Sequence, residues 1–187
     1  MELDVLEKEA SVCNRCSLYK GRVTPVFAKG NNNAKVIICG MVPAGEENKV
    51  GIPFVGRAGK LLDKILLDTG WTLDDVYVTN LVKCYLAAGF PLKQNWIDNC
   101  LPYLINQIAT IKPKVIITLG KDASVSLLSL NPNISLASIK GKLFDYLFDT
   151  KVIPTYHPSY LLRAGGVKHK NYGDVLNHFK MAKELLQ

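Results

Sequence analysis

The chain has 187 residues, 48% of them hydrophobic, and a formal net charge of +7. This length suits a single domain, residues 1–187, with a sizeable core. No apolar run approaches the ~18–20 residues of a membrane-spanning helix, and the acidic opening MELDVLEKEASVC is unlike a secretory signal. We therefore expect a cytoplasmic protein with no membrane partner. Charge alone leaves two interpretations open, an ordinary basic protein or one that binds a polyanion.

Four short segments rich in β-branched residues predict buried parallel strands. They are AKVIICG (34–40), DVYVTN (75–80), PKVIITLG (113–120) and TKVIPTYHP (150–158). Helical patterns alternate with them, at 58–70, 95–111, 122–130 and 173–186. This alternation predicts an α/β layered domain with a mainly parallel sheet, which binds ligands beyond the carboxyl ends of its strands.

A long segment follows the first strand at that edge, GMVPAGEENKVGIPFVGRAGKLL (40–62). Three roles are open to it: holding a phosphate, holding a base, or only turning a corner. It contains neither a G-x-G-x-x-G motif nor a P-loop, which argues against a mononucleotide site. Phe54, set between Pro53 and glycines, fits a stacking platform for a base or the hydrophobic anchor of the loop.

Two polar residues stand at the ends of other strands. Asn80 offers one donor and one acceptor to a base edge, or it caps a turn. His157, directly before a proline, is placed to donate to a developing anion, or it is a structural turn residue. Both expectations concern the same edge of the sheet.

Four of the five cysteines form a candidate metal site. Cys13 and Cys16 make a C-x-x-C pair, while Cys84 follows the second strand and Cys100 lies on the next predicted helix. Four thiolates suit either zinc or a [4Fe–4S] cluster, and the spacing does not decide between them. The odd total argues against a disulfide framework, and Cys39 is predicted to be strand core.

Taken together, these segments resemble the family 4 uracil-DNA glycosylases, the iron–sulfur branch of the uracil-DNA glycosylase superfamily. The resemblance covers nearly the whole chain, with motifs in the family's order and spacing. They are CNRC (13–16), PFVGRAGKLL (53–62), YVTNLVKC (77–84), Cys100, KVIITLG (114–120) and YHPSYLLR (156–163).

The resemblance implies a three-layer α/β/α fold with a small central, mainly parallel four-stranded sheet. It implies a [4Fe–4S] cluster on the four cysteines and an enzyme that flips uracil out of DNA and hydrolyses its N-glycosidic bond. Phe54 would stack on uracil, Asn80 would read its edge and His157 would stabilise the leaving anion, with Met41 and Val42 also against the base. The residues expected to contact DNA are Arg57, Lys60, Pro158, Ser159 and Arg163.

Two departures from the family pattern stand out. Met41 occupies the position of the family's first-motif glutamate, so Glu47 becomes the candidate for orienting water, unless it is only a solvated loop carboxylate. After Cys84 the family usually has Arg-Pro-Pro, whereas this chain has YLAAGFPLKQN, which leaves Lys83 and Lys93 as the nearby basic residues.

Three functions remain in competition: a monofunctional uracil-DNA glycosylase, a lesion-binding homologue with weak or altered specificity, and a nucleotide-binding or redox protein that uses the cluster. The first has uracil-containing DNA as its partner and is expected to act as a monomer. A sliding clamp or polymerase partner is not readable from the sequence.

Overall fold

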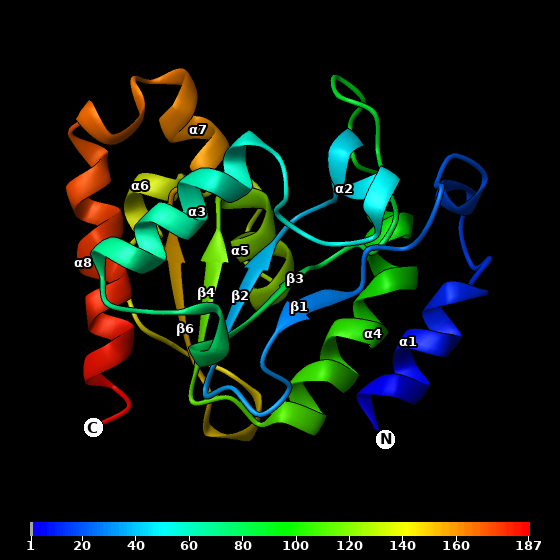
Figure 1. The fold of residues 1–187 in the computed structure, drawn as a ribbon, viewed down its shortest axis with the longest axis horizontal. Coiled ribbons are helices and arrows are strands. Elements are labelled where there is room, and N and C mark those ends of the chain that lie inside the picture. Colours follow the sequence, from blue (N-terminus) through cyan, green and yellow to red (C-terminus); the bar gives the residue numbers. More distant parts are fainter. Residues whose placement is uncertain (1) are drawn as a thin grey trace.

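The computed structural model describes residues 2–187, and within them a six-stranded sheet forms the centre of the fold (Figure 1). The strand order is β1-β3-β2-β4-β6-β5. The strands are β1 (Ala28–Gly30), β2 (Val36–Gly40), β3 (Val76–Asn80), β4 (Val115–Leu119), β5 (Phe144–Asp145) and β6 (Lys151–Thr155).

The four predicted strands are confirmed as the parallel centre of this sheet, β3-β2-β4-β6. The expected count of four is too low, because β1 and β5 add an antiparallel strand at each edge. These edge strands have three and two residues. Such short segments carry no periodicity of their own, so their conformation is set by the neighbouring strand.

Helices cover both faces of the sheet. The four predicted helices are confirmed as α3 (Arg57–Asp68), α4 (Gln94–Ile111), α5 (Lys121–Leu128) and α8 (Asn171–Glu184). Four further helices are α1 (Leu3–Ser11), α2 (Gly45–Val50), α6 (Leu136–Ile139) and α7 (Pro158–Arg163). Short 3₁₀ turns span Ser17–Lys20, Leu73–Asp75, Leu147–Asp149 and Gly166–Lys168.

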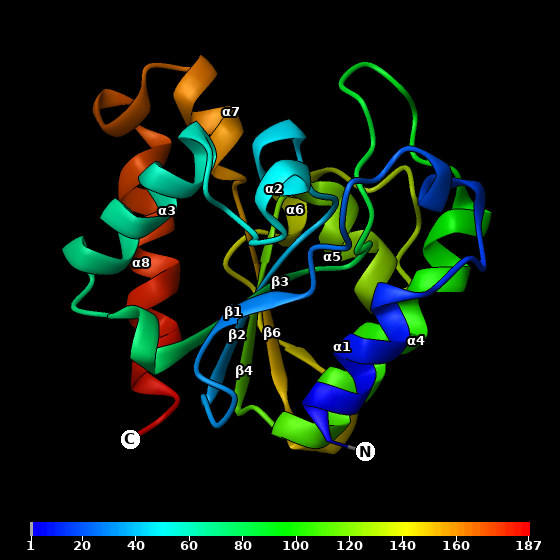
Figure 2. The same cartoon turned by 45° about the vertical axis from the view of Figure 1, so that its right-hand side comes forward.

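The pleat of β2 divides the core into two layers. Ile38 faces the hydrophobic cluster that α3 and α8 help to form, while Ile37 and Cys39 face the cluster of α1 and α4. Figures 1 and 2 show these helix pairs on opposite sides of the sheet. The three-layer α/β/α prediction is therefore confirmed. Cys39 is fully buried, as expected, and that burial raises the pKa of its thiol to about 12.

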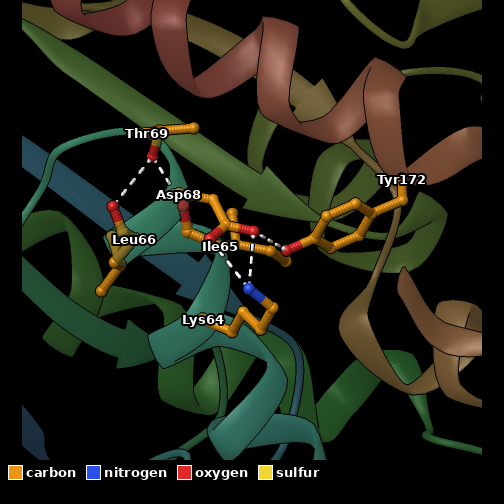
Figure 3. Close-up of polar contacts among 6 residues, drawn as sticks. All are labelled: Lys64, Ile65, Leu66, Asp68, Thr69 and Tyr172. Carbon is orange, nitrogen blue, oxygen red and sulfur yellow. Dashed lines mark hydrogen bonds and ion pairs between the residues drawn. The ribbon is translucent and has the colours of Figure 1, made fainter. Parts of the chain in front are cut away.

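A polar cluster joins α3 to α8 (Figure 3). The Asp68 carboxylate accepts hydrogen bonds from the Tyr172 hydroxyl at 2.8 Å and from Lys64 Nζ at 2.9 Å. The bond from Lys64 is the main cause of the lowered pKa of Asp68. Thr69 donates back to the Ile65 carbonyl at 2.7 Å and closes the end of α3. These contacts hold α3 in place along the sheet.

The carboxyl ends of the parallel strands meet at one edge, as parallel pairing requires. Two of the connections there contain short helices, α2 after β2 and α7 after β6. In residues 2–187, no helix combines the length and the apolar character needed to cross a membrane.

Candidate active site

A small cavity of about 50 Å³ lies at the carboxyl edge of the sheet. Its lining comes from the loop after β2, the start of α3, and the ends of β3 and β6. The residues are Val42, Pro43, Ala44, Glu47, Phe54, Ala58, Asn80 and His157. Residues predicted from four separate motifs are thus brought together around one hollow.

The loop holds Phe54 in a fixed position. Its φ of +54° is unusual for a residue with a side chain, and Lys29 Nζ donates to its carbonyl at 2.9 Å. A Cβ on Gly59 would lie 1.9 Å from the same carbonyl oxygen, so only glycine allows α3 to approach the loop this closely. The Phe54 ring lies 6.0 Å from that of His157, centre to centre.

Asn80 forms the wall of the small cavity opposite Phe54. It is the last residue of β3 and is 3% exposed. A Cβ on Gly40 would stand 2.3 Å from Asn80 Oδ1 and 2.7 Å from Phe54 Cζ. Gly40 therefore leaves the two side chains room to face each other across the end of β2.

His157 caps the N-terminus of α7 with its side chain. The backbone N–H of Ser159 donates to Nδ1 at 3.0 Å, and the Ser159 hydroxyl lies 2.7 Å from the same nitrogen. Because an N–H group can only donate, Nδ1 is the acceptor and the proton of the neutral ring sits on Nε2. Burial lowers the pKa of His157 to about 4, assisted by Arg163 and opposed by Glu47. The ring is therefore a neutral hydrogen-bond donor at pH 7.

This protonation state leads to a measurable titration. We expect the His157 imidazole signals in an NMR titration of the folded protein to stay constant from pH 8 to 5 and to shift only near pH 4. In urea the same ring should titrate near ~6.5. Between pH ~6.5 and about 4 the unfolded chain therefore binds more protons at this ring than the folded protein does. The free energy of unfolding should for this reason decrease as the pH falls through that range. A folded-state titration near 6.5 would contradict the assignment.

Glu47 is buried against the loop, with an exposed fraction of 6%. Its Oε2 accepts from the Ala44 N–H at 3.1 Å, and its Oε1 accepts from the N–H groups of Val55 and Gly56, both at 3.2 Å. The carboxylate thus joins the start of α2 to the segment that follows Phe54. It is not a solvated loop residue, and its charge is held beside the pocket.

Met41, unlike the other residues predicted to contact the base, does not line the small cavity. It is half-buried and lines two larger neighbouring cavities, of about 430 and 380 Å³, while Val42 lines the small one. The Met41 side chain thus belongs to the wall that the two larger cavities share and does not line the small one.

The predicted DNA contacts lie on α3 and α7, which pack against each other beside the pocket. Arg57, Lys60 and Arg163 are exposed, Ser159 is half-buried, and Pro158 is buried at the start of α7. The three exposed cations give this face positive charge.

The four candidate metal ligands line one small cavity, together with Arg22. Arg22 Nη1 donates to Cys84 Sγ, and the Lys83 backbone N–H donates to Cys100 Sγ, both at 3.2 Å. As they lie, no three His, Cys, Asp or Glu side chains of residues 2–187 form a ready metal site. Four thiols, with one guanidinium and one backbone N–H donating to their sulfurs, nevertheless suit a metal or cluster bound by thiolates.

Lys83 is a buried residue whose role the sequence did not reveal. It is 2% exposed, so of the two basic residues expected near the cysteines only Lys93 faces solvent. Lys83 Nζ donates to Asn80 O at 2.6 Å, and to Thr79 Oγ1 and Gln107 Oε1 at 2.7 Å each. It thereby connects the end of β3 to α4.

Comparison with known proteins agrees with this arrangement. The model of the uracil DNA glycosylase superfamily matches residues 27–180. A type-4 uracil-DNA glycosylase of Thermotoga maritima is 37% identical over 161 residues, or 86% of this chain and 83% of that protein. One from Saccharolobus solfataricus is 38% identical over 84% of this chain and 76% of that protein.

A type-5 uracil-DNA glycosylase of Pyrobaculum aerophilum is more distant, 27% identical over 75% of this chain and 67% of that protein. The chain therefore belongs to the uracil DNA glycosylase superfamily, and within it to the type-4 branch.

Proposed function

We propose that the protein is a monofunctional uracil-DNA glycosylase, which swings a uracil nucleotide out of DNA and hydrolyses its N-glycosidic bond. The observation that carries this proposal is the neutral His157, a donor through Nε2 in the pocket that Phe54 and Asn80 also line. The type-4 relatives carry the same activity in their names. The product would be an abasic site for base-excision repair.

The chemistry follows from where charge develops. As the bond breaks, the sugar becomes oxocarbenium-like and uracil leaves as an anion. His157 Nε2–H donates to an oxygen of that anion, Phe54 stacks on the ring, and the Asn80 amide pairs with its edge. None of the described residues that line the pocket is a lysine, so we expect no strand cleavage.

Glu47 supplies negative charge on the side of the sugar. Its carboxylate is held by three backbone N–H groups, which fixes it in the pocket wall to orient water or offset the sugar cation. Met41 provides no acid or base, so Glu47 is the carboxylate on which this reaction relies.

A single-turnover assay tests both the function and this role. Wild-type protein should release uracil from single- and double-stranded DNA. Glu47→Ala should slow release by about 10²-fold, because the pocket loses its carboxylate and the loop that carries Phe54 loses its anchor. The neighbouring Glu46→Ala, which removes an exposed pair with Lys49, should leave the rate unchanged. Met41→Glu, which restores the family acid, should release uracil at least as fast as wild type.

The same assay decides between an enzyme and a binding protein. If high concentrations of wild-type protein release no base yet still prefer uracil-containing DNA, the lesion-binding alternative holds. Thymine, hypoxanthine and xanthine substrates in the same panel define the range of bases accepted.

We also propose a structural [4Fe–4S] cluster on Cys13, Cys16, Cys84 and Cys100. The support is their shared cavity and the type-4 relationship. The Arg22 guanidinium would offset part of the negative charge of the four thiolates, since it already donates to Cys84 Sγ, and the Lys83 backbone N–H would donate to Cys100 Sγ. The cluster would join the N-terminal segment, the end of β3 and α4.

Iron content checks this assignment. Protein purified without oxygen should be brown and hold about four irons per chain. Cys100→Ala should lose both the iron and the visible absorbance. Cys39→Ala, which alters the buried thiol outside the site, should retain both. Colourless wild-type protein with one zinc would contradict the cluster.

We further propose that residues 1–187 act as one monomeric domain in the cytoplasm. The support for a single domain is that both hydrophobic clusters are built on the same sheet. Light scattering of the free protein, and of its complex with a short uracil-containing strand, should give one chain per particle.

A further inference from the structure

Two larger cavities follow the proposed uracil pocket. The first, of about 430 Å³, shares His157 with the pocket, and the second, of about 380 Å³, shares Met41, Lys121 and Asp122 with the first. The three hollows therefore form a row, in which each shares part of its wall with the next. The pocket of about 50 Å³ occupies only one end of it, which leaves the larger part without a role in holding uracil.

The far cavity lies between the loop that joins β3 to α4, the start of α4, and α5. Pro91 and Leu92 of the loop and Ile97 of α4 give it apolar walls, to which Gln94 and Ser126 add polar groups. Figures 1 and 2 show this loop rising beyond the carboxyl end of the sheet, on the same side as α2. The cavity therefore lies at the same end of the sheet as the uracil pocket.

An aromatic side chain stands near the end of this loop without packing into the core. Phe90 is 67% exposed, and its backbone N–H donates to the Ala87 carbonyl at 3.3 Å across a turn that contains Gly89 with φ +88°. Proteins that bind single-stranded DNA stack unpaired bases on aromatic side chains beside a groove, and Phe90 is placed to serve in this way.

We propose that the far cavity and Phe90 form a second nucleobase subsite, which takes the unpaired base of a nucleotide flanking the flipped uracil in single-stranded DNA. Phe90 stacks on the base at the rim, Leu92 and Ile97 cover its apolar face, and Gln94 pairs with its edge. Lys121, on the wall that both larger cavities share, lies close to the connecting phosphate.

The row of hollows favours DNA over other occupants. A strand whose uracil enters the pocket beside His157 would pass along the first cavity and then past Met41 into the far cavity. In duplex DNA the flanking base stays stacked and paired, so only a single strand delivers it. The subsite rests on the proposed function and predicts that the single strand is bound in preference to the duplex.

Binding of an uncleavable substrate tests the subsite. Oligonucleotides carry 2′-fluoro-deoxyuridine with fluorescent 2-aminopurine on its 5′ or 3′ side, single-stranded or paired. Phe90→Ser with Leu92→Ser should weaken single-strand binding about tenfold, which corresponds to the loss of one stacked base, and should abolish the 2-aminopurine quenching on one side. Duplex affinity should stay the same. Leu67→Ser, at a position 75% exposed on α3, is the matched control.

Other outcomes would overturn the subsite. Equal losses for single strand and duplex would do so, as would no loss for either. A wild-type dimer that the double variant dissociates would show that the loop contacts a second copy instead. Phe90→Trp, which keeps an aromatic ring, must retain the single-strand preference, so the result does not depend on the double variant folding. Uracil release from duplex DNA by wild-type protein tests the proposed function separately.

Discussion

Replacing His157 with alanine should lower the single-turnover rate constant for uracil release by about 10²–10³-fold, the usual cost of removing one donor to a developing anion. The Ser159 N–H fixes Nδ1 as an acceptor and leaves the proton on Nε2. Because the leaving charge exists only in the transition state, the loss should appear in the cleavage step. Affinity for an uncleavable uracil analogue should change little.

His169→Ala is the control for this variant. His169 Nδ1 also accepts a hydrogen bond from a backbone N–H, that of Asn171 at 3.2 Å. The centre of its ring lies 5.9 Å from the centre of the Tyr160 ring. It does not line the uracil pocket, so its loss should leave the rate constant unaffected. Cleavage by His157→Ala at the wild-type rate would remove His157 from the mechanism.

The site was predictable where chain connectivity alone decides position. Parallel strands bring their carboxyl ends to one edge, so Asn80 and His157 were expected at the same edge of the sheet. The loop after β2 was expected there for the same reason. That these residues line one cavity depends also on strand order, which the alternation of strands and helices does not give.

What the sequence left undecided depends on side-chain direction and burial. Glu47 is a loop carboxylate in the sequence, but α2, a helix of six residues too short for a periodic signal, turns it inward. Met41 precedes Val42 directly, yet the two side chains line different cavities. Lys29, which holds Phe54, lies on an edge strand of three residues that no sequence pattern marks.

Lys83 is the clearest case of burial that the sequence does not reveal. A lysine beside a cysteine motif suggests contact with DNA. The structure encloses it among Thr79, Asn80 and Gln107, all within 2.7 Å of Nζ. Burial lowers its pKa to about 8. The one sequence signal was its position inside the apolar run YVTNLVKC, where a solvated charge is unexpected.

Replacing Lys83 with methionine should lower the free energy of unfolding by about 2–4 kcal/mol, measured by urea denaturation. Methionine fills much of the space but leaves three buried oxygen acceptors without their donor. One of them is the Asn80 carbonyl, so the end of β3 should also lose its fixed position. Affinity for an uncleavable uracil analogue should therefore fall together with stability.

Lys93→Met separates this effect from a simple loss of charge. The Lys93 side chain is exposed, with Nζ 5.2 Å from the centre of the Trp96 ring, so its replacement should change the free energy of unfolding by less than ~0.5 kcal/mol. Both variants lower the net charge equally and should weaken long-range attraction to DNA alike. Equal unfolding free energies for the two would mean that the Lys83 hydrogen bonds add nothing beyond charge. A selective loss in Lys83→Met would instead identify the buried ammonium as the connection between the base-reading strand end and α4.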